Sequence, residues 1–290
     1  DEKTLCGTTG ETAVKTKLYS KSITIGTDSN KKTWSRTTPG KTSYREPDLV
    51  VGGNGLNYDA YYKTILEKNA TKEELAQLFV EDYKEMIESI QKYGGFYIGR
   101  YELSAAGVQK NQPTLVYTNW YNLYKKCKEL NASDKVETRM IWGCQWDVTM
   151  NWLISSGAKT SNEVNTDSSS WGNYKGTSVK SDDGTTEIKA SEDAQVLNTG
   201  KTTFTMANNI YDLAGNVWEW TQEAGGTGGR ADRGGDYGGG GFVAPASGRG
   251  YTSPDNSDND YRRFSSHFNN KVILDSRAWA PMERIIVKQT

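Results

Sequence analysis

The sequence predicts an α+β domain in which regular elements are joined by long irregular segments. Apolar residues recur at helical spacing in three segments, and several short segments have the alternation or apolar character of strands. Two long stretches, one rich in polar residues and one rich in glycine, show no periodicity. Helices, short strands and long loops in this combination are typical of the α+β class.

Residues 1–57 are rich in Thr, Ser, Lys and Gly and contain only short alternating pieces, such as 22–25. We expect this part to form an arm or strands that either extend from the core or pack on it. The first strong helix signal covers residues 71–93, where apolar residues recur every three or four positions before two glycines end the pattern. A strand over residues 96–102 follows directly.

A second helix is predicted over residues 119–130, a strand over 138–142 and a third helix over 145–155. Cys127 and Cys144 lie within this pattern. We interpret both as small buried apolar residues, since free cysteine is among the most buried residue types.

The remaining chain is less regular. Residues 156–200 are polar and are predicted to form long surface loops. Twelve of the 30 glycines fall between positions 225 and 250, a density that disfavours a helix and requires tight turns. An apolar stretch at 285–287 predicts a closing strand.

Composition excludes several classes of function. A net charge of −1 provides no field for binding nucleic acid, and no apolar run is long enough for membrane insertion. Three cysteines, the third being Cys6, do not make a disulfide scaffold. With His267 as the one histidine, a His-rich metal site and a Ser-His-Asp triad are not expected. Because the chain begins at Asp1, we expect that a targeting segment has been removed.

Four blocks of sequence carry a family resemblance. Residues 209–220 (NIYDLAGNVWEW), 230–235 (RADRGG), 96–102 (FYIGRYE) and 138–152 resemble motifs of the formylglycine-generating (sulfatase-modifying) enzyme family. The resemblance implies a C-type-lectin-like fold with low regular secondary structure, a small twisted antiparallel sheet and a few helices. The four blocks lie within residues 96–250, and the N-terminal third of the chain is not covered by the resemblance. We expect the domain itself to comprise residues 58–290.

The same family implies a structural calcium site. Carried over by position, its ligands are the side chains of Asp212 and Glu219 and the carbonyl oxygens of Gly215 and Val217. Hard oxygen ligands of this kind suit Ca²⁺. The alternative is a hydrogen-bonded structural cluster without metal.

The resemblance does not extend to catalysis. Catalytic members of the family use a pair of cysteines near the C-terminus that binds copper, and this chain has no cysteine after Cys144. We therefore expect no copper and no enzyme activity. A diverged formylglycine-generating oxidase or related modifying enzyme remains the first alternative, and a structural subunit of a pilus or phage tail the second.

Residues 232–264 consist mainly of Gly, Asp, Tyr, Ser, Asn and Arg, and resemble the variable regions of diversity-generating retroelement proteins. Tyrosine supplies rigid contact area, and Gly, Ser and Asn supply adaptable hydrogen bonding. We therefore expect a receptor-binding or adhesin-type domain, extracellular, on a cell surface or on a phage particle, that binds a protein or glycan; homo-oligomerisation is left open. The alternative is a loop that only closes the fold. The predicted ligand-binding residues are Asp236, Tyr237, Phe242, Tyr251, Asn256, Asn259, Tyr261 and Arg262.

Overall fold

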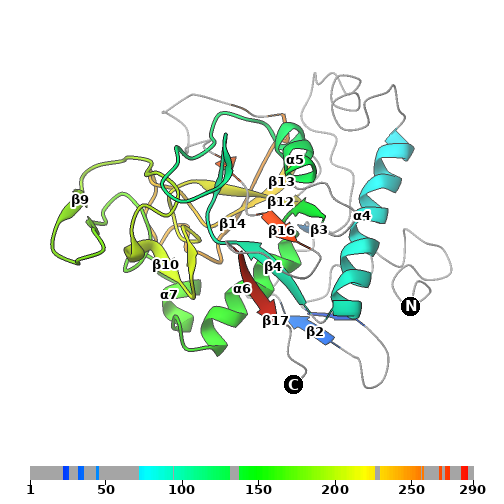
Figure 1. Cartoon of the computed structure of the whole chain (residues 1–290), viewed down its shortest axis with the longest axis horizontal. Coiled ribbons are helices and arrows are strands. Elements are labelled where there is room, and N and C mark those ends of the chain that lie inside the picture. Colours follow the sequence, from blue (N-terminus) through cyan, green and yellow to red (C-terminus); the bar gives the residue numbers. More distant parts are fainter. Residues whose placement is uncertain are drawn as a thin grey trace.

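The structure is a computed structural model of the chain (Figure 1). It describes residues 22–25, 32–35, 44–45, 72–93, 95–130, 137–225, 229–255, 257, 268–269, 272–274 and 282–286. Within these ranges the fold is mixed α/β, with a few helices and small, mainly antiparallel sheets.

The helices agree closely with the sequence analysis. They are α4 (Lys72–Tyr93), α5 (Trp120–Glu129), α6 (Gly143–Ser155) and α7 (Ser161–Asn165). The three predicted helices are confirmed, with ends that differ by at most two residues. The short α7 was not predicted. It is defined by a capping box between Thr160 and Glu163 and has no apolar periodicity that would have revealed it.

The larger sheet forms around the strand that begins at the end of the NIYDLAGNVWEW block (209–220). Its strands are β12 (Trp218–Gly225), β13 (Gly229–Arg233), β14 (Arg249–Thr252), β15 (Phe268–Asn269) and β3 (Tyr44–Arg45). The order is β14-β13-β12-β15, and β3 also pairs with β12. The expected antiparallel pairing holds for β12 with β13, β13 with β14 and β12 with β3. One pair in this sheet, β12 with β15, is parallel, and the wide separation of these strands in sequence permits the crossover that parallel pairing needs.

The second sheet has the order β17-β4-β16-β7, with antiparallel neighbours throughout. Its strands are β4 (Gly95–Gly99), β7 (Thr138–Met140), β16 (Val272–Leu274) and β17 (Met282–Ile286). The predicted closing strand corresponds to β17. The strand predicted over 96–102 ends earlier, at Gly99, because the chain then turns into a separate small hairpin.

Short hairpins complete the described structure. They are β1 (Ser22–Ile25) with β2 (Lys32–Ser35), β5 (Leu103–Ser104) with β6 (Gly107–Val108), β8 (Val179–Lys180) with β9 (Glu187–Lys189), and β10 (Met206–Ala207) with β11 (Ile210–Tyr211); a 3₁₀ turn covers Thr203–Thr205. The β8–β9 hairpin lies within the stretch predicted as loops, and its tip is at the opposite end of the molecule from α4 (Figure 1).

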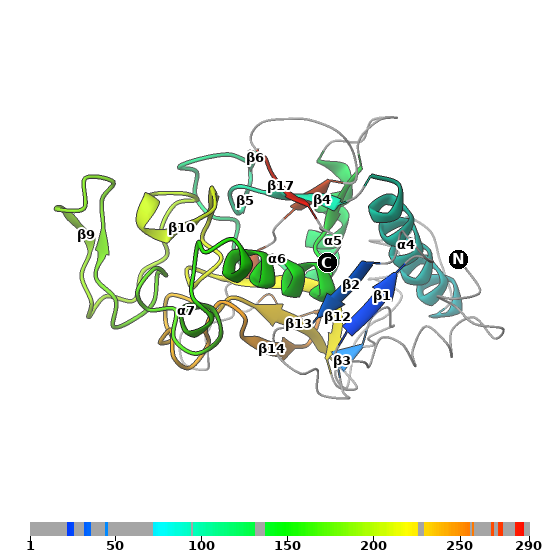
Figure 2. The same ribbon diagram turned by 90° about the horizontal axis from the view of Figure 1, so that it is seen from below.

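The core lies around α6, which runs between the two larger sheets (Figure 2). One hydrophobic cluster surrounds this helix and includes Trp146 and Cys144, and a second surrounds Trp120 and includes Cys127. Both cysteines are at most 1% exposed, which confirms their interpretation as buried apolar residues. In the part of the chain that the structure describes, no helix combines the length and apolar character needed to cross a membrane.

Candidate binding face and its buried support

The turn before β12 requires glycine and asparagine at particular positions. Gly215 has φ +70°, and a Cβ there would lie 2.3 Å from the carbonyl oxygen of Asn173. The next residue, Asn216, also has a positive φ, and its Oδ1 accepts from Asn173 Nδ2 and from the Leu197 backbone N–H, each at 2.9 Å. Its Nδ2 donates to Glu102 Oε2 at 2.7 Å. Asn216 therefore joins three distant segments, a role that the sequence analysis missed.

The residues predicted to bind calcium are all buried. Asp212 Oδ2 accepts from the Gly200 backbone N–H at 2.7 Å, and its Oδ1 accepts from Thr205 Oγ1 at 2.6 Å. Glu219 lies so close to Gly234 that a Cβ at Gly234 would be 2.5 Å from Glu219 Oε2. An ionised carboxylate oxygen has two lone pairs, so the bonds to Asp212 do not by themselves exclude a cation.

Among the described residues, no group of three or more His, Cys, Asp or Glu side chains could hold a metal ion. The predicted site, with two carboxylates and two backbone carbonyls, is of a different composition. The calcium ion therefore stays a prediction.

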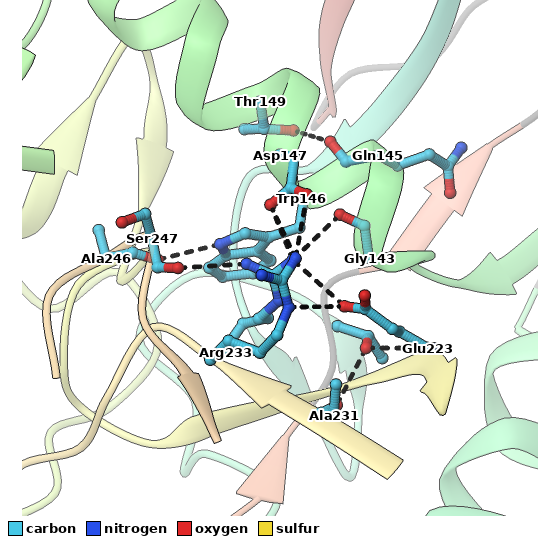
Figure 3. Close-up of polar contacts among 12 residues, drawn as sticks. Gly143, Gln145, Trp146, Asp147, Thr149, Glu223, Ala231, Arg233, Ala246 and Ser247 are labelled. Carbon is cyan, nitrogen blue, oxygen red and sulfur yellow. Dashed lines mark hydrogen bonds and ion pairs between the residues drawn. The ribbon is translucent and has the colours of Figure 1, made fainter. Parts of the chain in front are cut away.

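A buried ion cluster lies between α6 and the larger sheet (Figure 3). Arg233 Nη2 is 2.7 Å from Asp147 Oδ1 and 3.3 Å from Glu223 Oε2. Arg249 completes the cluster, 3.1 Å from Asp147 Oδ2 and 3.0 Å from Glu223 Oε2. The four side chains are at most 4% exposed and their formal charges cancel. The cluster ties α6 to β12, β13 and β14.

A further buried acid, Asp232, lies on β13 and is 4% exposed. Its Oδ2 accepts from Thr252 Oγ1 at 3.0 Å, and Gly250 packs so closely that a Cβ there would be 2.1 Å from Asp232 Oδ1. Burial raises the pKa of Asp232 to about 7, although the hydrogen bond from Thr252 acts in the opposite direction. This carboxyl group therefore titrates near neutral pH.

Two of the predicted ligand-binding residues are buried, contrary to the expectation of an exposed face. Asp236 and Tyr237 are each 4% exposed. Asp236 Oδ1 accepts from the backbone N–H groups of Gly238 and Gly239, each at 2.8 Å. Its side chain therefore turns back to cap the glycine-rich loop, residues 234–248 between β13 and β14. Burial raises the pKa of Asp236, and these backbone hydrogen bonds oppose the rise.

Two others are exposed as predicted. Phe242 is 70% exposed and Tyr251 is 63% exposed. Val243, which the sequence analysis did not select, is 66% exposed. Asn256, Asn259, Tyr261 and Arg262 lie outside the described residues.

The loop that carries Phe242 is held at several points. The carbonyl oxygen of Gly239 accepts from the Lys175 N–H at 3.0 Å, and that of Gly241 accepts from the Ser168 N–H at 3.2 Å. The hydroxyl of Tyr174 lies 3.0 Å from the carbonyl oxygen of Ala244 and donates to it. Burial, followed by the nearby Glu219 carboxylate, raises the pKa of Tyr174 well above its usual value, so this hydroxyl is a neutral donor.

No protein-family model matches the chain, and no curated protein matches it either. Among solved structures, the chain is similar to Treponema denticola variable protein 1, with 14% sequence identity, covering 87% of this chain and 98% of that chain. The TM-score is 0.27, which does not establish a shared fold. The C-type-lectin-like fold and the family resemblance therefore stay predictions.

Proposed function

We propose that this chain is a non-catalytic ligand-binding protein whose contact surface lies in residues 232–264. The observation that carries the proposal is the position of the exposed apolar side chains. Phe242, Val243 and Tyr251 are three of the four large hydrophobic residues that are exposed in the described part of the chain. Isolated exposed apolar residues are common. These three belong to one stretch of ten residues, and contiguous exposed apolar surface marks interaction sites, so we take this stretch as the contact surface.

The architecture around these residues supports a role in binding. Phe242 and Val243 project from a loop whose backbone is held by Asp236, Lys175 and Ser168. A contact loop that is ordered before binding loses little conformational entropy on association. Aromatic anchors on such a surface commonly contribute most of the binding energy.

The two cysteines that the structure describes favour binding over catalysis. Cys127 and Cys144 are buried in different hydrophobic clusters, so neither presents a thiolate to solvent for redox chemistry. On the resemblance of residues 232–264 to variable regions, we propose a C-type-lectin-like scaffold displayed outside the cell, with a protein or glycan on a cell surface as partner. A calcium ion held by Asp212 and Glu219 would stabilise that scaffold.

The proposal is tested by screening the purified chain against a glycan microarray and a displayed library of microbial surface proteins. Any binding found should weaken at least about tenfold in a Phe242→Ser, Tyr251→Ser double variant, because two aromatic anchors are removed. Tyr117→Ser is the matched control, since Tyr117 is 45% exposed and lies outside residues 232–264.

Binding that survives the double substitution contradicts the proposed surface. Comparison of related copies of the gene gives an independent result, since the proposal expects substitutions to concentrate in residues 232–264. Oxidation of a cysteine-containing peptide by the copper-loaded chain would instead support the enzymatic alternative.

A further inference from the structure

One buried lysine lies among backbone carbonyl groups. Lys189, the last residue of β9, is 2% exposed. Its Nζ donates to the backbone oxygens of Thr177 at 2.8 Å, Tyr174 at 3.0 Å, Asp193 at 3.1 Å and Ala190 at 3.2 Å. We call these four oxygens the carbonyl cage. Lysine is almost never buried to this extent unless its charge is compensated.

The carbonyl cage has the chemistry of a cation site. An ammonium group has three N–H donors and no acceptor, so four convergent oxygens satisfy it completely. Rings of backbone carbonyl oxygens are also what proteins use to hold K⁺ and, together with carboxylates, Ca²⁺. Burial lowers the pKa of Lys189, and the carboxylates of Asp193, Glu187 and Glu192 act in the opposite direction.

The segment around the cage has little regular secondary structure. The β8–β9 hairpin consists of strands of two and three residues with an irregular register. One backbone hydrogen bond, from Gly176 N–H to the Ser191 carbonyl at 2.7 Å, closes the two ends of the segment. Four oxygens brought together from both ends would repel one another without a cation between them.

We propose that residues 174–193 form a cation site that the chain fills with its own ammonium group, that of Lys189, in place of a bound metal ion. Lys189 holds the backbone carbonyl of Tyr174, one of the four oxygens of the cage. At its other end, the Tyr174 hydroxyl contacts the carbonyl oxygens of Gly234 and Ala244 in the glycine-rich loop. Lys189 is thereby a positioning residue for the glycine-rich loop. The inference does not depend on the proposed ligand-binding function.

The first test removes the charge and keeps the length of the side chain. Lys189→Met should lower the Tm by about 5–10 °C, since several buried carbonyl oxygens lose their donor. Lys175→Met is the matched control, because Lys175 is exposed and belongs to the same segment. Its Tm should stay within about 2 °C of the wild type. Equal melting temperatures for the two variants overturn the proposal.

The second test replaces the missing cation from solution. Lys189→Ala removes three methylene groups and the ammonium, which together correspond to propylammonium. Propylammonium chloride should raise the Tm of Lys189→Ala, relative to sodium chloride at equal ionic strength, and should leave Lys175→Ala unchanged. 1-Propanol has the same shape without the charge. An equal response to propanol and propylammonium overturns the role of the charge.

The third test uses the wild-type chain and keeps the proposal falsifiable if the Lys189 variants do not fold. A segment organised by an internal cation should protect the Gly176 amide, whose acceptor is the Ser191 carbonyl, by at least about a hundredfold in hydrogen exchange. Exchange of this amide at the rate of an unstructured peptide overturns the proposal.

Discussion

Asp232→Asn replaces an acid that the fold buries with a neutral side chain of the same shape. The asparagine Oδ1 can still accept from the Thr252 hydroxyl, as the carboxylate does at 3.0 Å. The substitution therefore isolates the effect of charge at this position. We expect the variant to be more stable than the wild type at neutral and alkaline pH.

The sign and size follow from the pKa of Asp232, which burial raises from its usual 3.8 to about 7. Between these values the folded state binds a proton that the unfolded state does not, so wild-type stability falls as the pH rises. Well above pH 7, the ionised Asp232 lowers the free energy of unfolding by its full amount, roughly 4 kcal/mol at 1.36 kcal/mol per pKa unit. About 3 kcal/mol of it develops between pH 5 and pH 8.

The assay is urea unfolding of both proteins, followed by tryptophan fluorescence, at pH 5 and pH 8. The stability advantage of Asp232→Asn should be larger at pH 8 by about 3 kcal/mol. Comparing the two proteins at each pH cancels the titration of groups that both contain. A stability difference that is the same at both pH values refutes the reasoning.

Three further predictions concern the ion cluster, the glycine-rich loop and the calcium site. Arg233→Met should cost at least about 3 kcal/mol in urea unfolding, because two buried carboxylates lose one of their two arginine partners and the buried cluster is left with an uncompensated negative charge. Lys125→Met, in an exposed pair, should cost less than about 1 kcal/mol; similar losses for the two variants would contradict the importance of burial. Gly241→Ala should lower the Tm, because its Cβ would lie 2.5 Å from the backbone nitrogen of Ser169. Gly239→Ala is the control, since the closest contact of its Cβ would be 3.6 Å. A Gly241→Ala protein as stable as Gly239→Ala would show that the loop is not fixed. A chelator should lower the Tm of the wild type and excess Ca²⁺ should restore it; an unchanged melting curve argues against the calcium site.

The sequence predicted secondary structure best where the signal was local and periodic. The three longer helices follow from apolar spacing, and their ends agree with the structure to within two residues. The short α7 and the β8–β9 hairpin were missed, because a capping box and a short turn define them without an apolar stripe.

The candidate binding residues were predicted less well. In a strand, alternation assigns each side chain to one face, but the glycine-rich loop between β13 and β14 has no period. Composition alone could not tell that Asp236 and Tyr237 turn inward while Phe242 turns outward. The backbone N–H groups that Asp236 caps decide its direction, and these are visible only in the folded loop.

By itself, the sequence determined the class of secondary structure, the main helices and the region that carries exposed aromatic residues. Tertiary structure alone decided the partners of the buried charges. Asp147 and Arg233 are 86 positions apart, and the four oxygens around Lys189 belong to the backbone, which every residue type shares. Such contacts leave no local pattern, because their energy comes from burial and convergence of groups that the folded chain alone brings together.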